Sequence, residues 1–299
     1  MKKVDTQRWS IEQRLEFIEF RLFWDGALQR SDIMRKFNVS APQASKDIRA
    51  YRESVPTNID YDSSKKCFVA GKAFEAKHYT PNAARYLAQI GAIKNGTISV
   101  DDTLISSLIS HDSLPIPSRG VSANRLRRIM AAIRLRRSLS IEYLSMNPKR
   151  LGRTWREISP HSLAYDGTRW HARALCHISK TYKDFIISRC VNIGEMSVQL
   201  AGQGEDHQWN TFFDVKLIPN PDFVEHQKQV IESDYGMESG YTTIRIRIAM
   251  LYYFDKRMRL DIPQEPDRPT KNPIVVENRE AYNEALAGVY PAPAIEFVI

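Results

Sequence analysis

The chain has 299 residues, with 43 lysines and arginines against 35 aspartates and glutamates, so its formal net charge is +8. Its 42% apolar and 26% charged residues are an ordinary globular composition, and this length predicts two or three domains. The longest apolar run, 248–254, is far below the roughly 20 residues that span a bilayer, and the N-terminus has no signal-peptide pattern. Three widely spaced cysteines, Cys67, Cys176 and Cys190, argue against a disulfide framework or a zinc site. We therefore expect a reduced, cytoplasmic chain without a cofactor or metal.

The first 52 residues have the periodicity of helices. Ser10 is expected to cap a first helix that ends at Gly26, because apolar residues recur at helical spacing behind Ser10. Ser31 is expected to cap a short second helix and Ser40 a third, with the tight turn 38–40 between them. Two short helices joined by such a turn are typical of a helix-turn-helix, and so is the polar and basic outer face of the third helix.

The outer face of the third helix carries residue types that read DNA. Gln43 suits adenine, whereas Lys46 and Arg49 suit guanine or phosphate. We predict DNA contacts from Ser31, Ser40, Gln43, Ser45, Lys46, Arg49 and Arg52. A solvated three-helix bundle without a DNA role is the alternative interpretation of the same pattern.

Residues 57–71 change to the pattern of a β-hairpin, with two short strands around a polar turn. Lys65 and Lys66 lie at this turn and are expected to contact phosphates or the minor groove, as the wing of a winged helix-turn-helix would. On its own such a turn would be a solvated loop, so the prediction depends on the helices that precede it.

A helical linker and a strongly basic region follow. Helices are predicted over 82–93 and 122–137, and residues 119–200 carry a net charge of +11 against +3 for residues 1–118. Beyond the second helix the pattern is strand-like, in the segments Ser140–Tyr143, Arg156–Leu163, Arg169–Ile178 and Phe185–Val191. A helix followed by several short strands indicates a small, curved sheet or barrel.

Strand alternation groups polar and cationic side chains on one face of this region. They are Arg169, His171 and Arg173 on one strand, Ser159 and His161 on another, and Arg189 at the end of a third. The opposite face of the first strand, with Trp170, Ala172 and Ala174, is predicted to be core. Because arginine forks suit phosphate oxygens, the cationic face is predicted to bind a phosphate-bearing ligand. The alternatives are a buried structural histidine at 171 and a structural ion pair at Arg189.

Residues 119–195 resemble the WYL domain, a small Sm-like β-barrel of bacterial transcription regulators. The resemblance is carried by Ser140–Tyr143, Ile158–Leu163, Tyr165–Trp170 and Ile187–Arg189, while the naming tripeptide retains only Trp170. The order of a winged helix-turn-helix, a WYL domain and a C-terminal α+β extension is similar to that of regulators encoded beside phage-defence systems such as BREX and CBASS.

This resemblance implies a homodimeric regulator, usually a repressor, whose WYL barrel senses a nucleotide or nucleic acid. By position, the family's ligand pocket corresponds to Tyr143, Ser159, His161, Arg169, His171, Arg173 and Arg189. The resemblance also implies that the C-terminal extension helps the protein to dimerise.

The last third of the chain is acidic, with a net charge of −6 over residues 201–299, which suits neither DNA nor a phosphate ligand. A small α+β module is predicted, with strands over 213–218 and 241–249, helices over 222–235 and 251–259, and a proline-rich loop over 263–273. The aromatic run 251–254 is expected to form either a dimer contact or part of this module's core.

The sequence therefore predicts a multidomain α+β protein in four parts. They are a winged helix-turn-helix domain (1–75), a helical linker (76–118), a WYL ligand-sensing domain (119–200) and a C-terminal dimerisation domain (201–299). We expect a ligand-responsive repressor that binds an inverted-repeat operator in double-stranded DNA as a homodimer and controls a phage-defence locus. An activator whose WYL domain binds single-stranded DNA, and a non-specific nucleic-acid-binding adaptor, stay open as alternatives.

Enzymatic activity is not expected. No phosphate-loop, dinucleotide-binding, nucleophile-elbow or zinc-protease motif occurs, and the histidines are scattered. The adjacent acids Glu205 and Asp206 are expected to be solvated in a linker, so they do not form a metal site for a nuclease.

Overall fold

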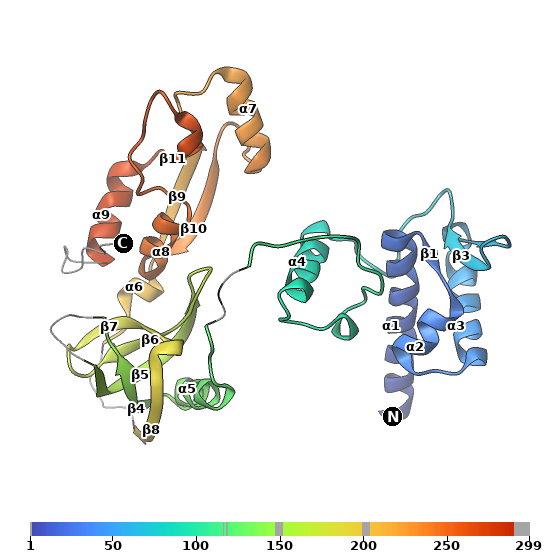
Figure 1. The fold of residues 1–299 in the computed structure, drawn as a ribbon, viewed down its shortest axis with the longest axis horizontal. Helices are drawn as coiled ribbons and strands as arrows, with labels where there is room; N and C mark the ends of the chain where they lie inside the picture. The colour runs from blue at the N-terminus through green and yellow to red at the C-terminus, as the bar shows by residue number, and fades with distance from the viewer. Residues whose placement is uncertain (1, 116, 118, 147–151, 199–203, 290–299) are drawn as a thin grey trace. The chain divides into compact units, whose positions relative to one another are not determined.

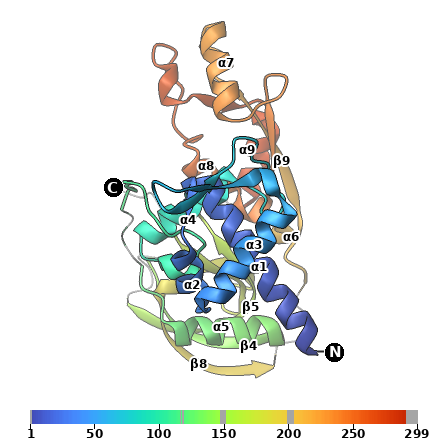
Figure 2. The ribbon, with the colours of Figure 1, turned by 90° about the vertical axis from the view of Figure 1, so that its right-hand side faces the viewer.

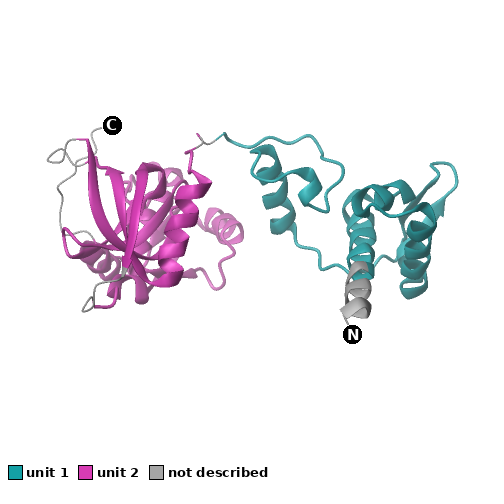
Figure 3. Ribbon diagram, turned by 90° about the horizontal axis from the view of Figure 1, so that it is seen from below, with its two compact units in different colours: residues 1–116 teal, residues 117–299 magenta. Residues whose placement is uncertain are grey.

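The computed structural model describes residues 2–115, 117, 119–146, 152–198 and 204–289. The chain divides into two compact units, residues 1–116 and 117–299, which Figure 3 shows in different colours. None of the described helices is both long and apolar enough to cross a membrane.

The first unit is a group of three helices with a small antiparallel sheet, followed by a fourth helix (Figure 1). Its elements are α1 (Lys2–Asp25), β1 (Ala27–Leu28), α2 (Arg30–Phe37), α3 (Ala41–Ser54), β2 (Ile59–Asp62), β3 (Cys67–Ala70) and α4 (Ala83–Lys94). The sheet order is β1-β3-β2, so the predicted wing hairpin pairs with a short strand that was not predicted. Phe17 and Ile18 of α1 pack with Ile33 of α2 and Ile48 of α3 in one core. This arrangement confirms the winged helix-turn-helix.

The turn of the helix-turn-helix is the one predicted. Asn38 closes α2 in the left-handed region at φ 51°, a conformation that asparagine tolerates better than most residues. Ser40 caps α3 by accepting the Gln43 backbone N–H at 3.4 Å. These two features determine where α2 ends, where α3 begins and how the chain turns between them.

The two other predicted caps are wrong. α1 begins at Lys2, so Ser10 lies inside the helix rather than at its start. α2 is capped by Gln29, whose backbone N–H donates to Asp32 Oδ2 at 2.8 Å, and Ser31 lies within its first turn. Both errors have the same cause, because serine is a common cap residue and is also tolerated inside a helix.

A buried carboxylate joins α1 to the chain that follows the wing. Glu19 is fully buried and accepts the Tyr51 hydroxyl at 3.0 Å and the Lys77 backbone N–H at 2.8 Å, together with the N–H groups of His78 and Tyr79. Burial, with the nearby Glu19 carboxylate, raises the pKa of Tyr51, so its hydroxyl stays protonated as a donor. One side chain therefore connects α1, α3 and the segment leading to α4.

Replacing Glu19 with glutamine should lower the free energy of unfolding by about 2–3 kcal/mol, because only one acceptor oxygen remains and the amide nitrogen must face either the backbone N–H groups or the Asn58 amide donor. Urea denaturation of the full chain measures the change. Glu53→Gln, on the exposed side of α3, is the matched control and should stay within about 0.5 kcal/mol of the wild type. Equal losses in the two variants would contradict the role of Glu19.

The second unit begins with α5 (Ala123–Leu135) packed on a five-stranded antiparallel sheet (Figure 2). The strands are β4 (Arg137–Leu144), β5 (Arg153–Tyr165), β6 (Trp170–Cys176), β7 (Thr181–Ile186) and β8 (Cys190–Val198), in the order β7-β6-β5-β4-β8. Ile129 and Ala132 of α5 join Leu139, Ile141 and Ile158 of the strands in the core. The apolar residues of α5 thus face the sheet, as those of an amphipathic helix do.

The sheet differs from the prediction in three respects. Strands β7 and β8 are its edges, and no ladder joins them within the described ranges, so a closed barrel is not confirmed. The single predicted strand over 185–191 is wrong, because the 3₁₀ turn Ile187–Arg189 separates β7 from β8. Trp170 is 51% exposed and stacks on Tyr165, with 4.9 Å between ring centroids, whereas Ala172 and Ala174 are core as predicted. Trp170 opens the strand, beyond the end of the core.

The C-terminal part of this unit is an α+β module. Its elements are α6 (His207–Asn210), β9 (Phe212–Pro219), α7 (Glu225–Asp234), β10 (Thr242–Arg247), α8 (Leu251–Arg257), β11 (Ile274–Val276) and α9 (Arg279–Val289). The sheet order is β10-β9-β11, all antiparallel, and Val215, Leu217, Leu251 and Tyr282 form its core. The predicted strands and helices are present with shifted ends, whereas α6, β11 and α9 were missed. Within the aromatic run, Leu251 belongs to this core.

Candidate functional site

The exposed side of α3 carries three basic side chains in a row. Lys46, Arg49 and Arg52 are exposed, three residues apart, and have no acidic partner among the described residues. Residues at this spacing share one helix face. The opposite face, with Ala44, Ile48 and Tyr51, is buried. The helix therefore presents a positively charged face at a fixed orientation.

Two other predicted DNA contacts on α3 form hydrogen bonds with other side chains of the protein. Gln43 Nε2 donates to Asp47 Oδ1 at 2.9 Å, and the buried Asp47 also accepts Arg14 Nε at 2.7 Å. Ser45 Oγ accepts Arg30 Nη1 at 3.3 Å. Arg30 is exposed at the start of α2, its bond to Ser45 places it beside α3, and it was not among the predicted contacts.

The remaining predicted DNA contacts lie at the start of α3, in α2 and at the tip of the wing. Ser40 serves as the cap of α3, and Ser31 is exposed in the first turn of α2. Lys65 and Lys66 are exposed at the tip of the β2–β3 hairpin, where Lys66 adopts a left-handed φ of 51°. Lys65 Nζ lies 3.8 Å from Asp62, a loose surface pair that leaves the ammonium group accessible.

The predicted ligand residues of the second unit separate into small clusters, the first around Asp166. Asp166 Oδ2 lies 2.9 Å from both Arg169 Nε and His171 Nε2, and His171 is 2% exposed. Burial alone would raise the pKa of Asp166, but hydrogen bonds from His171, Thr168 and Arg169 outweigh it and hold the pKa well below its ordinary value. Arg169 and His171 thus already have an anionic partner.

The second cluster is centred on Asp206. Arg173 is 3% exposed and donates to both Asp206 oxygens, at 2.7 and 3.1 Å, and lies 3.5 Å from Asp184. His161 Nε2 is 3.1 Å from Asp206 Oδ2. The prediction that Asp206 is solvated is wrong, since it is buried and caps α6. The pair connects β6 to the segment that enters the C-terminal module.

Ser159 lies apart from His161, contrary to the predicted shared face. The register between β5 and β6 shifts between Pro160 and Ser162, so the extra residue turns His161 away from the alternation. Ser159 is buried and bonds His177 Nε2 at 2.8 Å.

Tyr143 and Arg189 belong to a third cluster, together with Arg156, which was not predicted. The Arg156 guanidinium lies 5.3 Å from the centroid of the Tyr143 ring, is 8% exposed, and leaves Nε without a hydrogen-bond partner. Arg189 Nη2 contacts Met146 Sδ at 2.8 Å. Within the described part of the chain, neither arginine has a carboxylate partner. The signal that could have found Arg156 is its position two residues before the core residue Ile158 on β5, which places a charge on the apolar side.

The described residues contain no group of three or more His, Cys, Asp or Glu side chains arranged to hold a metal ion. A winged helix-turn-helix with a free basic helix face, followed by a second unit with its own core, is the architecture of a DNA-binding transcription regulator. Three family models match the chain: the BrxR transcriptional regulator winged helix-turn-helix domain at 10–92, the WYL domain at 124–193, and the BrxR transcriptional regulator C-terminal dimerization domain at 212–282.

Curated relatives match over almost the whole length. The DNA-binding transcriptional repressor CapW of Stenotrophomonas maltophilia is 35% identical over 91% of each chain. The repressors of the same name from Pseudomonas aeruginosa and Escherichia coli (strain KTE188) are 32% identical over 93% and 31% identical over 91% of each chain. The chain belongs to the family of CapW DNA-binding transcriptional repressors. The resemblance predicted from the sequence is confirmed, and membership of this family points to a regulator rather than an enzyme.

Proposed function

We propose that the protein is a ligand-responsive repressor that binds an inverted-repeat operator as a homodimer and controls a phage-defence locus. The exposed row of Lys46, Arg49 and Arg52 on α3, none of which has an acidic partner among the described residues, carries the DNA-binding part of this proposal. In a dimer, two such helices would enter successive turns of the major groove, about 34 Å apart. The CapW relatives are named repressors, which supports repression over activation. The match to a dimerisation domain supports the homodimer.

Protection of the DNA upstream of the protein's own gene tests operator recognition. We expect two protected half-sites related by a two-fold axis, about one helical turn apart. We also expect reporter output from that promoter to rise when the gene is deleted. Uniform protection of any duplex would contradict operator recognition, and a fall in output would support the activator instead.

We infer that the anionic ligand binds at Tyr143, Arg156 and Arg189. A buried guanidinium without a counter-charge is costly, and a phosphate oxygen that reached Arg156 Nε would offset that cost. The cations around Asp166 and Asp206 are less suitable, because a ligand would have to displace a buried carboxylate from each. The exposed Trp170–Tyr165 stack offers an aromatic face to a base, which favours a nucleic acid as the ligand.

Such a ligand would act by binding one shape of the dimer more tightly than the other. Its differential affinity sets how far the equilibrium moves, and binding of ligand and operator must oppose each other reciprocally. Release of DNA therefore requires only that the ligand-bound shape separates the two α3 helices by a distance that does not match the operator.

Arg189→Ala should weaken binding of a fluorescent single-stranded oligonucleotide by roughly 10- to 100-fold, because a hydrogen bond to a charged group contributes about 1.5–3 kcal/mol. Anisotropy titration of the full chain at constant salt measures the change, since phosphate binding depends on salt. Arg127→Ala, which removes an exposed arginine of α5, is the control and should change affinity little. Equal weakening in the two variants would indicate a diffuse basic surface instead of a site.

A further inference from the structure

Two arginines on the sheet of the C-terminal module are stacked against aromatic rings. The Arg247 guanidinium lies 4.8 Å from the centroid of the Trp209 ring and 4.6 Å from that of the Phe212 ring, and its Nη1 donates to the Trp209 carbonyl. The Arg245 guanidinium lies 4.9 Å from the same Phe212 centroid. Phe212 is nevertheless 39% exposed, and Arg245 is exposed as well. These four side chains, the arginine stack, therefore hold two cations in place at the surface of the module.

Strand alternation places the arginine stack on the side of the sheet that faces away from the core. Val215 of β9 and Ile246 of β10 pack in the core, so their neighbours Asp214 and Arg245 point the other way. Helices α7, α8 and α9 all contribute side chains to that core, so they pack on the opposite side of the sheet. These helices therefore leave the outer side of β9 and β10 as a flat surface of charged and aromatic side chains.

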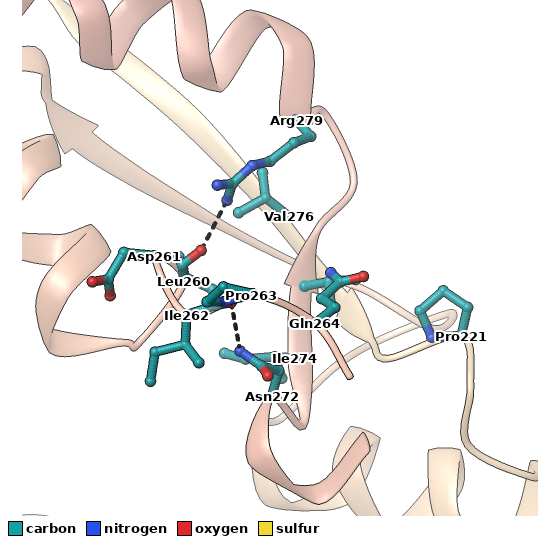
Figure 4. A pocket seen from close by; sticks show the side chains of 11 residues that line it. Pro221, Leu260, Asp261, Ile262, Pro263, Gln264, Asn272, Ile274, Val276 and Arg279 are labelled. Atoms are coloured by element: carbon teal, nitrogen blue, oxygen red, sulfur yellow. Dashed lines mark hydrogen bonds between the residues drawn. The ribbon is translucent and has the colours of Figure 1, made fainter. Parts of the chain in front are cut away.

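The arginine stack is separate from a cavity in the same module. Figure 4 shows this cavity of about 530 Å³, whose lining includes the core residues Leu260, Ile274 and Val276. No side chain of the arginine stack lines it. The stack is therefore a feature of the outer surface, and the flat face of a sheet suits another protein surface better than a small molecule.

Charge indicates which protein surface fits this face. Arg245 and Asp214 are opposite each other on β10 and β9, and both are exposed. Among the described residues no ion pair joins them, and neither has another charged partner. An arginine and an aspartate side by side are complementary to a second copy of the same face, because each can meet the other across a two-fold axis. A nucleic acid fits less well, because residues 201–299 carry a net charge of −6 and Asp214 would repel phosphate.

We propose that the outer face of β9 and β10 binds the same face of a second copy of the chain, an inference that rests on the proposed homodimer. A two-fold axis between the two strands and parallel to them lays β10 of each copy over β9 of the other. In that arrangement Arg245 meets Asp214 of the partner subunit, and Arg247 meets Phe212 of the partner subunit.

The composition of the face and the family match both support this occupant. Arginine and aromatic side chains are enriched at the centres of protein interfaces and contribute most of their binding energy. The arginines are already held by the rings, so they lose little conformational freedom on association. The match to a dimerisation domain, residues 212–282, includes β10 and all of β9.

Two charge-reversed variants of the full chain test the pairing. Arg245→Asp places two aspartates against each other across the two-fold axis, and Asp214→Arg places two arginines there. Because each reversal acts at both symmetric contacts, each variant alone should self-associate roughly 100-fold more weakly than the wild type. An equimolar mixture of the two variants should restore the dimer, because both contacts then join opposite charges. Sedimentation velocity over a concentration series measures the association.

Lys228→Asp is the control, because it reverses a charge on α7, whose Ile231 packs on the core side of the sheet. It should leave self-association unchanged. Circular dichroism follows folding, and if a reversal impairs it, Arg245→Gln, which removes only the charge, should still weaken association by roughly 10-fold.

The outcomes separate this interface from the proposed homodimer. Variants that dimerise as tightly as the wild type would overturn the interface and leave the homodimer intact. Weakening that the mixture does not reverse would also overturn it, because the two side chains then do not meet across a two-fold axis. A monomeric wild type would contradict the homodimer and the interface together.

Discussion

Replacing Arg173 with methionine should lower the free energy of unfolding of the second unit by about 3–5 kcal/mol. The methionine keeps most of the side-chain volume but leaves Asp206 and Asp184 buried without their guanidinium. Breaking a buried ion pair from one side is strongly destabilising for this reason, whereas the net contribution of the intact pair is much smaller. Because Asp206 begins the C-terminal module, we also expect the module to loosen from β6.

Urea denaturation of the full chain, followed by fluorescence and circular dichroism, measures this loss. Lys256→Met removes the exposed pair with Asp261 and is the matched control, which should stay within about 1 kcal/mol of the wild type. Adding Asp206→Asn to Arg173→Met should cost less than the sum of the two single changes, because the uncompensated charge is then removed. Additive losses would show that the two side chains do not act as a pair.

Acid should remove the contribution of the same pair. Burial alone would raise the pKa of Asp206, but hydrogen bonds from His161 and Arg173 hold it below its ordinary value. A carboxylate with a lowered folded-state pKa contributes its full stability above the unfolded-state pKa of about 4 and loses it as the pH falls. The free energy of unfolding should therefore fall below about pH 4, and it should fall less in Arg173→Met.

The first unit could be predicted closely because its signals are local. A cap at Ser40, a turn at Asn38 and apolar residues at helical spacing fix α2 and α3 within 25 residues of chain. The wing depended on an equally local pattern around Lys65 and Lys66. The start of α1 and the cap of α2 were predicted wrongly, and β1 was missed because a strand of two residues has no period to detect.

The candidate ligand site was harder to predict because the charges around it pair over long distances. Arg173 and Asp206 are 33 residues apart, and no spacing rule connects a strand arginine to a linker aspartate. Alternation also failed at one bulge, which turned His161 away from Ser159. Counting net charge on a face therefore overestimated how many cations are free. Arg156, which has no carboxylate partner among the described residues, emerged only from the contacts.

Lys46→Ala combined with Arg49→Ala should weaken operator binding by roughly 100-fold or more. Each specific contact contributes about 1–3 kcal/mol, and a dimer loses the pair of contacts at both half-sites. The substitutions lie on the exposed side of α3, opposite Ala44, Ile48 and Tyr51, so folding should be unaffected. Gel-shift titrations with the operator at fixed salt measure the change.

The single variants separate reading of bases from contact with phosphates. If Arg49 pairs with guanine, Arg49→Ala relaxes specificity at one base pair of each half-site and leaves non-specific binding almost unchanged. If Lys46 contacts phosphate, Lys46→Ala weakens all sequences alike and reduces the salt dependence of binding. Arg85→Ala removes one exposed charge from α4 in the same unit and should have little effect. A loss as large in Arg85→Ala would mean that overall charge, rather than the α3 face, determines affinity. The N-terminal unit is only modestly basic, because the middle of the chain holds most of the net positive charge. The comparison with Arg85→Ala therefore tests whether the placement of the α3 side chains, rather than total charge, determines operator binding.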